Sequence, residues 1–76
     1  MNDLFSKEIP TMFALSMSQN IVAMSCYSNL DFERQKDIHS YIQNSATAYD
    51  AKRRIDACIM NLESYNTEFF DNIKDD

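Results

Sequence analysis

The side chains that could carry out catalysis are few and lie apart along the chain. His39 is the only histidine, and its polar neighbours Asp37 and Ser40 fan out in different directions around a helix. A catalytic site needs a nucleophile or an acid–base pair that converges in a pocket. We therefore interpret His39 as a half-exposed helical residue, and we expect that the protein is not an enzyme.

Cys26 and Cys58 are the only cysteines, and each lies among apolar residues at helical spacing. Two cysteines and one histidine do not match the ligand spacing of a metal site, and two cysteines do not make the disulfide framework of a secreted domain. We expect both thiols to be reduced and buried, with a bridge possible only if their helices pack side by side. We accordingly expect a cytoplasmic location and no metal or other cofactor.

The charges divide the chain into a balanced part and an acidic part. Residues 1–54 contain six acids and six bases, whereas residues 55–76 contain six acids and only Lys74, so the net charge of −5 lies in the last third. The single basic cluster, Lys52-Arg53-Arg54, lies between Asp50 and Asp56, which would neutralise it on a solvated helix face. We therefore expect no nucleic-acid binding, and we expect the acidic part to attract a basic protein surface.

The elements that must position these residues are predicted to be helices. The chain has no glycine and one proline, Pro10, so β-hairpins and phosphate-binding loops are disfavoured, and apolar residues recur at spacings of three and four. Ser28-Asn29-Leu30-Asp31 is the strongest break, and Thr47 with Asp50 resembles a capping box. These signals predict one all-α domain over residues 1–76, with helices at about 11–27, 32–43 and 47–73.

The third predicted helix has the clearest hydrophobic stripe. Its members step by three and four along the sequence: Ala48, Ala51, Ile55, Cys58, Leu62, Tyr65 and Phe69. A small three-helix bundle follows if the chain breaks at residues 43–47. The alternative is a helical hairpin, in which the second and third helices form one rod. In both arrangements the long last helix would overhang the others, and it would expose Phe69, Phe70 and Ile73.

The first predicted helix lies in a segment that contains no charge. None of the 22 residues from Ile9 to Leu30 is charged, and 13 of them are apolar. A membrane span is disfavoured because Gln19 and Asn20 would lie near the bilayer centre. A helix that is apolar around most of its circumference needs cover on most sides. We therefore expect self-association or a protein partner to complete the fold.

Two short segments resemble known families. Leu30-Asp31, Gln35, Asp37 and Ile38 resemble the turn region of the Rop family of plasmid copy-number regulators, which are small acidic helical hairpins that dimerise. That family binds RNA through polar and basic residues of its first helix. Residues 11–27 here contain no Lys or Arg, so RNA binding is not implied, and five matching positions do not assign the chain to this family.

The second segment, Glu68-Phe69-Phe70-Asp71, resembles the core of the FFAT motif, which binds VAP proteins in an extended conformation. Asn72 and Lys74 replace the alanine and glutamate usual there, and the segment continues a helical stripe, so we interpret its phenylalanines as core or interface residues.

These observations favour a protein-binding function. Large aromatic residues among charges and flexible methionines are typical of contact surfaces, so the expected partner-binding residues are Met12, Met17, Met24, Glu68, Phe69, Phe70, Asp71 and Ile73. The first hypothesis is a stoichiometric inhibitor, adaptor or regulator of a larger protein, of the kind that phages and plasmids encode. The second is a self-assembling homo-oligomer, most simply a homodimer, and the third is an RNA- or DNA-binding regulator.

Overall fold

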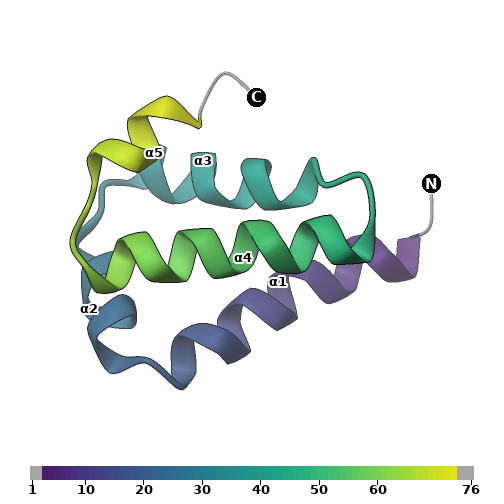
Figure 1. The fold of residues 1–76 in the computed structure, drawn as a ribbon, viewed down its shortest axis with the longest axis horizontal. Helices are drawn as coiled ribbons and strands as arrows, with labels where there is room; N and C mark the ends of the chain where they lie inside the picture. The colour runs from purple at the N-terminus through teal and green to yellow at the C-terminus, as the bar shows by residue number, and fades with distance from the viewer. Residues whose placement is uncertain (1–2, 74–76) are drawn as a thin grey trace.

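The computed structural model describes the backbone of residues 3–73 and the side chains of residues 11–73. The fold is all-helical, with five helices and no strand within the described residues. The helices are α1 (Asp3–Ser18), α2 (Ile21–Asn29), α3 (Phe32–Gln43), α4 (Ala48–Glu63) and α5 (Glu68–Asn72). In Figure 1, α4 lies in the middle, α1 and α2 lie along one side of it, α3 lies along the other, and α5 packs beside α3.

The helix predicted at residues 11–27 is wrong in its bounds, because the charge-free segment contains a break. The backbone N–H of Asn20 still bonds to Met17 at the end of α1. Asn20 then becomes extended, and its side-chain oxygen accepts a hydrogen bond of 3.1 Å from the N–H of Ala23. This contact is an N-cap, which satisfies a backbone donor that the first turn of α2 leaves free.

The helix predicted at residues 32–43 is confirmed, and so is the break that follows it. Asp31 is the N-cap residue of α3, although its carboxylate forms no cap hydrogen bond and lies 3.5 Å from Arg34 instead. At the start of α4, Thr47 accepts a hydrogen bond of 3.0 Å from the N–H of Asp50. Helices α3 and α4 are therefore separate, and the alternative of one continuous rod is wrong.

The long last helix is also wrong, because α4 ends at Glu63. The N–H of Asn66 bonds to the carbonyl of Asn61, and the N–H of Tyr65 bonds to Leu62, which is the pattern of a Schellman C-cap. Tyr65 takes the left-handed position of that motif with φ of 57°. The chain turns there, so α5 folds back onto α3, and the expected overhang does not form.

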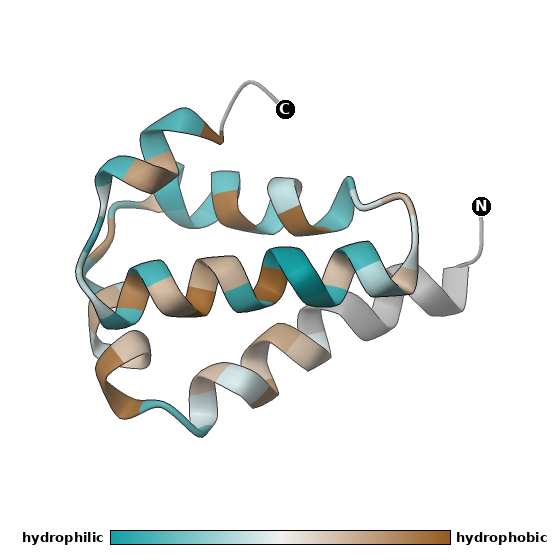
Figure 2. Cartoon of the chain, in the orientation of Figure 1, coloured by the Kyte–Doolittle hydropathy of each residue, from teal (hydrophilic) through white to brown (hydrophobic). Residues whose placement is uncertain are grey.

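The core is built by one chain. Along α3 and α4, hydrophobic residues (brown) recur between hydrophilic ones (teal). In the described part of α1 and most of α2, hydrophobic and intermediate residues (brown and pale) dominate (Figure 2). Four members of the predicted stripe are buried, namely Ala51, Ile55, Cys58 and Leu62, whereas Ala48 and Tyr65 are exposed. Among residues 11–73, the buried hydrophobic residues are Phe13, Ala23, Cys26, Ile38, Ile42, Ala51, Ile55, Cys58, Leu62, Phe70 and Ile73.

Candidate protein-binding surface

The one histidine lies in an aromatic cluster that joins three helices. The Nε2 atom of His39 on α3 is 2.6 Å from the hydroxyl of Tyr27 on α2. The Phe13 ring on α1 lies edge-on to both rings, at 5.7 Å from each. Burial lowers the pKa of His39 and raises the pKa of Tyr27, because both charged forms lose hydration.

This cluster has a structural explanation. The hydroxyl and the imidazole satisfy each other, and within the described residues no third side chain hydrogen-bonds to either group. A general base is normally oriented by such a third group and directed at a nucleophile. The pair therefore holds α2 and α3 together, and its geometry does not form a catalytic constellation.

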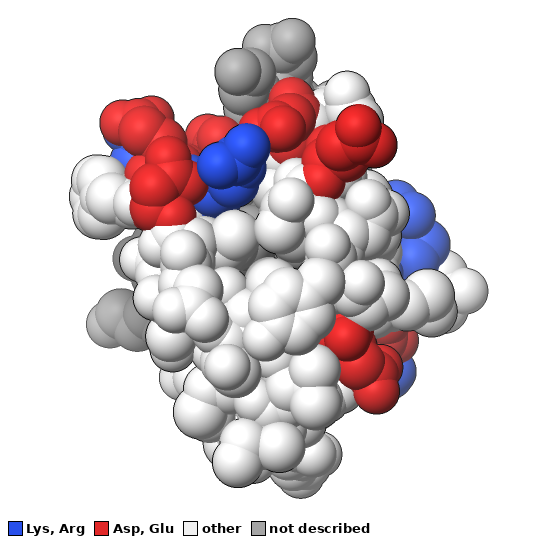
Figure 3. All heavy atoms as spheres, turned by 90° about the vertical axis from the view of Figure 1, so that its left-hand side faces the viewer, with Lys and Arg blue, Asp and Glu red and all other residues white. Residues whose placement is uncertain are grey.

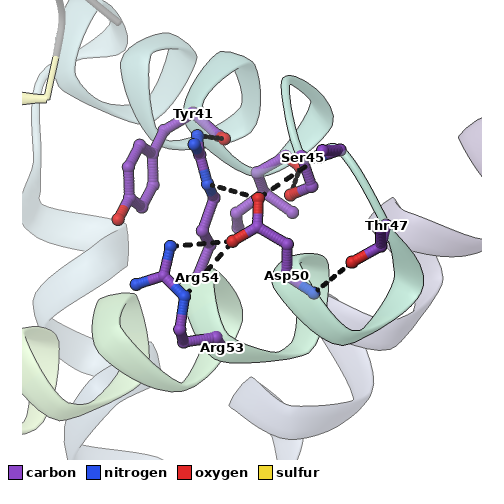
Figure 4. Close-up of polar contacts among 8 residues, drawn as sticks. Tyr41, Ser45, Thr47, Asp50, Arg53 and Arg54 are labelled. Atoms are coloured by element: carbon purple, nitrogen blue, oxygen red, sulfur yellow. Dashed lines mark hydrogen bonds and ion pairs between the residues drawn. The ribbon is translucent and has the colours of Figure 1, made fainter.

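The basic cluster, Lys52-Arg53-Arg54, contributes hydrogen bonds that stabilise the turn between α3 and α4. Asp50 accepts hydrogen bonds from Arg53, at 2.7 and 3.2 Å, and from the N–H of Ala46 (Figure 4). Arg54 donates to the carbonyl of Tyr41 at 2.7 Å and stacks 4.6 Å from the centre of the Tyr41 ring. The hydrogen bond from Arg53 is the main reason why the pKa of Asp50 is lowered.

The positive charges of Lys52, Arg53 and Arg54 are largely unavailable to the phosphate backbone of a nucleic acid. The Nε atom of Arg54 lies 3.3 Å from Asp50 without the geometry of a hydrogen bond, and only Lys52 and Arg53 are exposed. Lys52 pairs with Asp56 at 3.2 Å. The three bases are thus engaged by acids of the same helix, as the sequence predicts.

Both cysteines are free and buried. Burial raises the pKa of the Cys58 thiol to about 12, so this thiol is not a nucleophile at neutral pH. Helices α2 and α4, which carry the two cysteines, pack against each other. Among the described side chains, no group of three His, Cys, Asp or Glu residues converges on a possible metal position.

The feature that these sites leave unexplained is a broad uncharged surface. Figure 3 views the molecule from the side on which Figure 1 shows α2, the end of α4 and the turn to α5. Most of this side carries no charge, and acidic side chains, with a basic one between them, gather along its upper edge, at the height of α5; another acidic group lies at its lower right edge. We refer to exposed hydrophobic residues of these three elements as the uncharged face: Ile21, Val22 and Met24 on α2, Met60 on α4, and Tyr65 in the turn.

The geometry of α2 explains why its residues remain exposed. Ala23 and Cys26 point into the core with less than 3% exposure, whereas Ile21 is 81% exposed. At about 100° per residue, positions 21 and 24 lie on the arc opposite the two buried residues, whereas position 22 lies on the flank of the helix, next to Cys26. The outer arc thus carries the hydrophobic Ile21 and Met24 beside Ser25 and Ser28, all exposed, while the chain covers only the inner arc.

A hollow lies elsewhere, between α1 and α4. It has a volume of about 220 Å³ and is lined by Met12, Leu15, Ser16, Lys52, Ile55 and Asp56. Ligand pockets for small molecules are usually larger, at roughly 300–1,000 Å³. The lining is mainly apolar, and the only charges are the paired Lys52 and Asp56, so the hollow carries no reactive group.

The structure separates the expected partner-binding residues into two groups. Met12, Met24, Glu68 and Asp71 are exposed, and Met17 is partly buried against the core. The expected overhang of Phe69, Phe70 and Ile73 is absent: Phe70 is 0% and Ile73 is 5% exposed, and Phe69 packs edge-on against Tyr41. The phenylalanines lie on helix α5, so the segment that resembles the FFAT motif is not extended.

No protein-family model matches the chain, and no curated protein or solved structure is detectably similar to it. The surface must therefore be interpreted from its own chemistry. Ile21, Val22, Met60 and Tyr65 were not among the residues expected at a contact surface. For Ile21 the signal was available, because an inward-facing Ala23 and Cys26 leave position 21 on the opposite side of the helix.

None of the helices within the described residues is long and apolar enough to cross a membrane.

Proposed function

We propose that this chain acts by binding another protein through the uncharged face, as a stoichiometric inhibitor, adaptor or regulator rather than as an enzyme. The observation that carries the proposal is the exposure of Ile21 and Met24 on the outer arc, and of Val22 on the flank, of a helix whose inner arc is fully buried. Exposed apolar surface bordered by polar residues is characteristic of protein interaction sites. A cytoplasmic setting of the kind expected from the sequence is part of this proposal.

Further support comes from the completeness of the core. The accessible surface is 4949 Å², close to the roughly 4,800 Å² expected for a folded monomer of this mass. The exposed hydrophobic residues are therefore additional to a core that one chain already encloses. A partner would bind a preformed face, and it is not needed to close the core as we expected from the sequence.

Capture experiments with matched variants test the proposal. Ile21→Ser removes the most exposed side chain of the face. Tyr49→Ser removes an equally exposed side chain, at 80%, from the start of α4, whereas the face includes only the end of that helix. We expect Ile21→Ser to lose a binding protein that the wild type and Tyr49→Ser both retain, with all three melting alike. Equal capture by all three proteins would contradict the proposal.

Self-association is the second candidate, because the uncharged centre of the face could pack against its copy without bringing like charges together there. Sedimentation of the purified chain distinguishes the two. A dimer that Ile21→Ser dissociates and Tyr49→Ser does not would favour the homo-oligomer over the partner. Nucleic-acid binding is the third candidate, and the acidic edge and the neutralised basic cluster both disfavour it.

A further inference from the structure

The charge around the uncharged face indicates what kind of protein would bind there. Residues 55–73 contain four acids, Asp56, Glu63, Glu68 and Asp71, and no base. The last three belong to the end of α4 and to α5, on either side of the turn that carries Tyr65. An acidic border and an uncharged centre thus occur on the same side of the molecule (Figure 3).

The acids of this border differ in how far they are already neutralised. Asp71 is held by Arg34 at 3.0 Å; outside the border, nearer the start of α4, Asp56 is held by Lys52 at 3.2 Å. Glu63 and Glu68 are exposed and form no salt bridge with any side chain of residues 11–73. Within the described side chains, these two carboxylates are thus the acids of the border that have no basic partner.

Helix α2 has no basic residue that could neutralise the charges of Glu63 and Glu68. No residue from 9 to 30 is charged, so the helix that forms the hydrophobic centre of the face contains neither a base nor an acid. Electrostatic complementarity at an interface requires the opposite sign on the partner, at the positions that meet the border. A phosphate backbone or an anionic membrane would be repelled by the same carboxylates.

Resting on the proposed function, we propose that the partner is a protein surface with an apolar centre and a lysine- or arginine-bearing border. Its apolar residues pack on Ile21, Val22 and Met24, and its basic residues lie over Glu63 and Glu68. Tyr65, in the turn that joins the helices of the two glutamates, offers an exposed ring that a lysine or arginine side chain can cover. Apolar contacts supply most of the affinity, and the carboxylates set the preference for a basic partner.

Two synthetic amphipathic helical peptides test this inference directly. Both carry the same leucine stripe, and their polar positions are lysine in one peptide and glutamate in the other. Binding is followed by the backbone amide NMR signals of the full chain at low and high salt. We expect the lysine peptide to bind more tightly than the glutamate peptide, to shift the signals of α2 and the end of α4, and to weaken as salt is added.

Charge-removing variants supply the matched comparison. Glu63→Gln and Glu68→Gln should each weaken the lysine peptide by roughly two- to fivefold. Asp56→Asn, which makes the same change of charge at a paired site, should leave its affinity within about twofold of the wild type. Ile21→Ser should weaken both peptides.

The outcomes separate this inference from the proposed function. Equal binding of the two peptides would overturn the inference that the partner is basic. So would Glu63→Gln and Glu68→Gln variants that bind the lysine peptide as well as Asp56→Asn does. If Ile21→Ser still abolished capture of the cellular partner in that case, the protein-binding function would stand. Binding of neither peptide, or occupation of the face by a second copy of the chain, would also overturn the inference.

Discussion

Arg34 on α3 holds Asp71 on α5 through two parallel hydrogen bonds, from Nε to Oδ1 and from Nη2 to Oδ2, each 3.1 Å long. The hydrogen bond to Asp71 is the main reason why the pKa of Arg34 is raised. Beside this pair, Tyr41 on α3 meets the ring of Phe69 edge-on at 6.0 Å. The chain thus docks its own last helix, which removes Phe70 from the surface and leaves the uncharged face as the principal unexplained feature.

Phe70→Ala should destabilise the fold strongly, by roughly 3–5 kcal/mol, because it leaves a cavity at a fully buried position. Asp71→Asn should have a much smaller effect, because a solvent-exposed ion pair contributes little to stability. Urea denaturation of both variants measures the difference. Equal stabilities would mean that α5 is held by its ion pair and that Phe70 is not a core residue.

His39 should make the fold sensitive to mild acid. Burial lowers its pKa below the ordinary value of 6.5, so the folded state favours the neutral ring. The unfolded chain then binds protons more readily, and stability is fully present above about pH 6.5 and falls as the pH drops below it. Denaturation at about pH 7 and about pH 5.5 should show this loss in the wild type.

The control for this acid effect is His39→Gln, which keeps a hydrogen-bonding side chain near Tyr27 and removes the titrating ring. Its stability should change less than that of the wild type between the same two pH values. An identical pH dependence in both proteins would show that another group is responsible.

Tyr65→Gly should stabilise the isolated chain by about 1 kcal/mol, because only glycine occupies the left-handed position without a steric penalty. Tyr49→Gly, inside α4, should instead destabilise the fold, because glycine has a low helix propensity. Thermal melting measures both. If the Tyr65 ring contacts the partner, the more stable Tyr65→Gly variant will also bind more weakly, and a gain in both properties would contradict that role.

The sequence predicted those elements whose signals are local. The break at residues 28–31 and the cap at Thr47 depend on side chains that bond to the adjacent backbone, so α3 and the start of α4 occur where expected. The stripe of Ala51, Ile55, Cys58 and Leu62 faces the core because its period matches the helix. An all-α fold follows from the same patterns.

The errors arose where the chain turns without glycine or proline. Asn20 caps α2 within an apolar run whose periodicity continues past it, so periodicity alone does not show the break. Tyr65 adopts a positive φ that sequence reasoning assigns to glycine or asparagine. Neither turn was predicted. Because of the turn at Tyr65, Phe70 and Ile73 are buried in the core, whereas the sequence predicted them on an exposed overhang.

The central claim is that the uncharged face contacts another protein, and a photo-reactive amino acid at position 22 tests it most directly. Val22 lies on α2 within the face, and the same amino acid at the exposed position of Tyr49 is the control. Illumination in the native cells should join position 22, but not position 49, to one distinct protein. Adding Ile21→Ser should abolish that adduct. Adducts of equal yield at both positions, or none at position 22, would contradict the account, and an adduct between two copies of the chain would replace the partner by a homodimer.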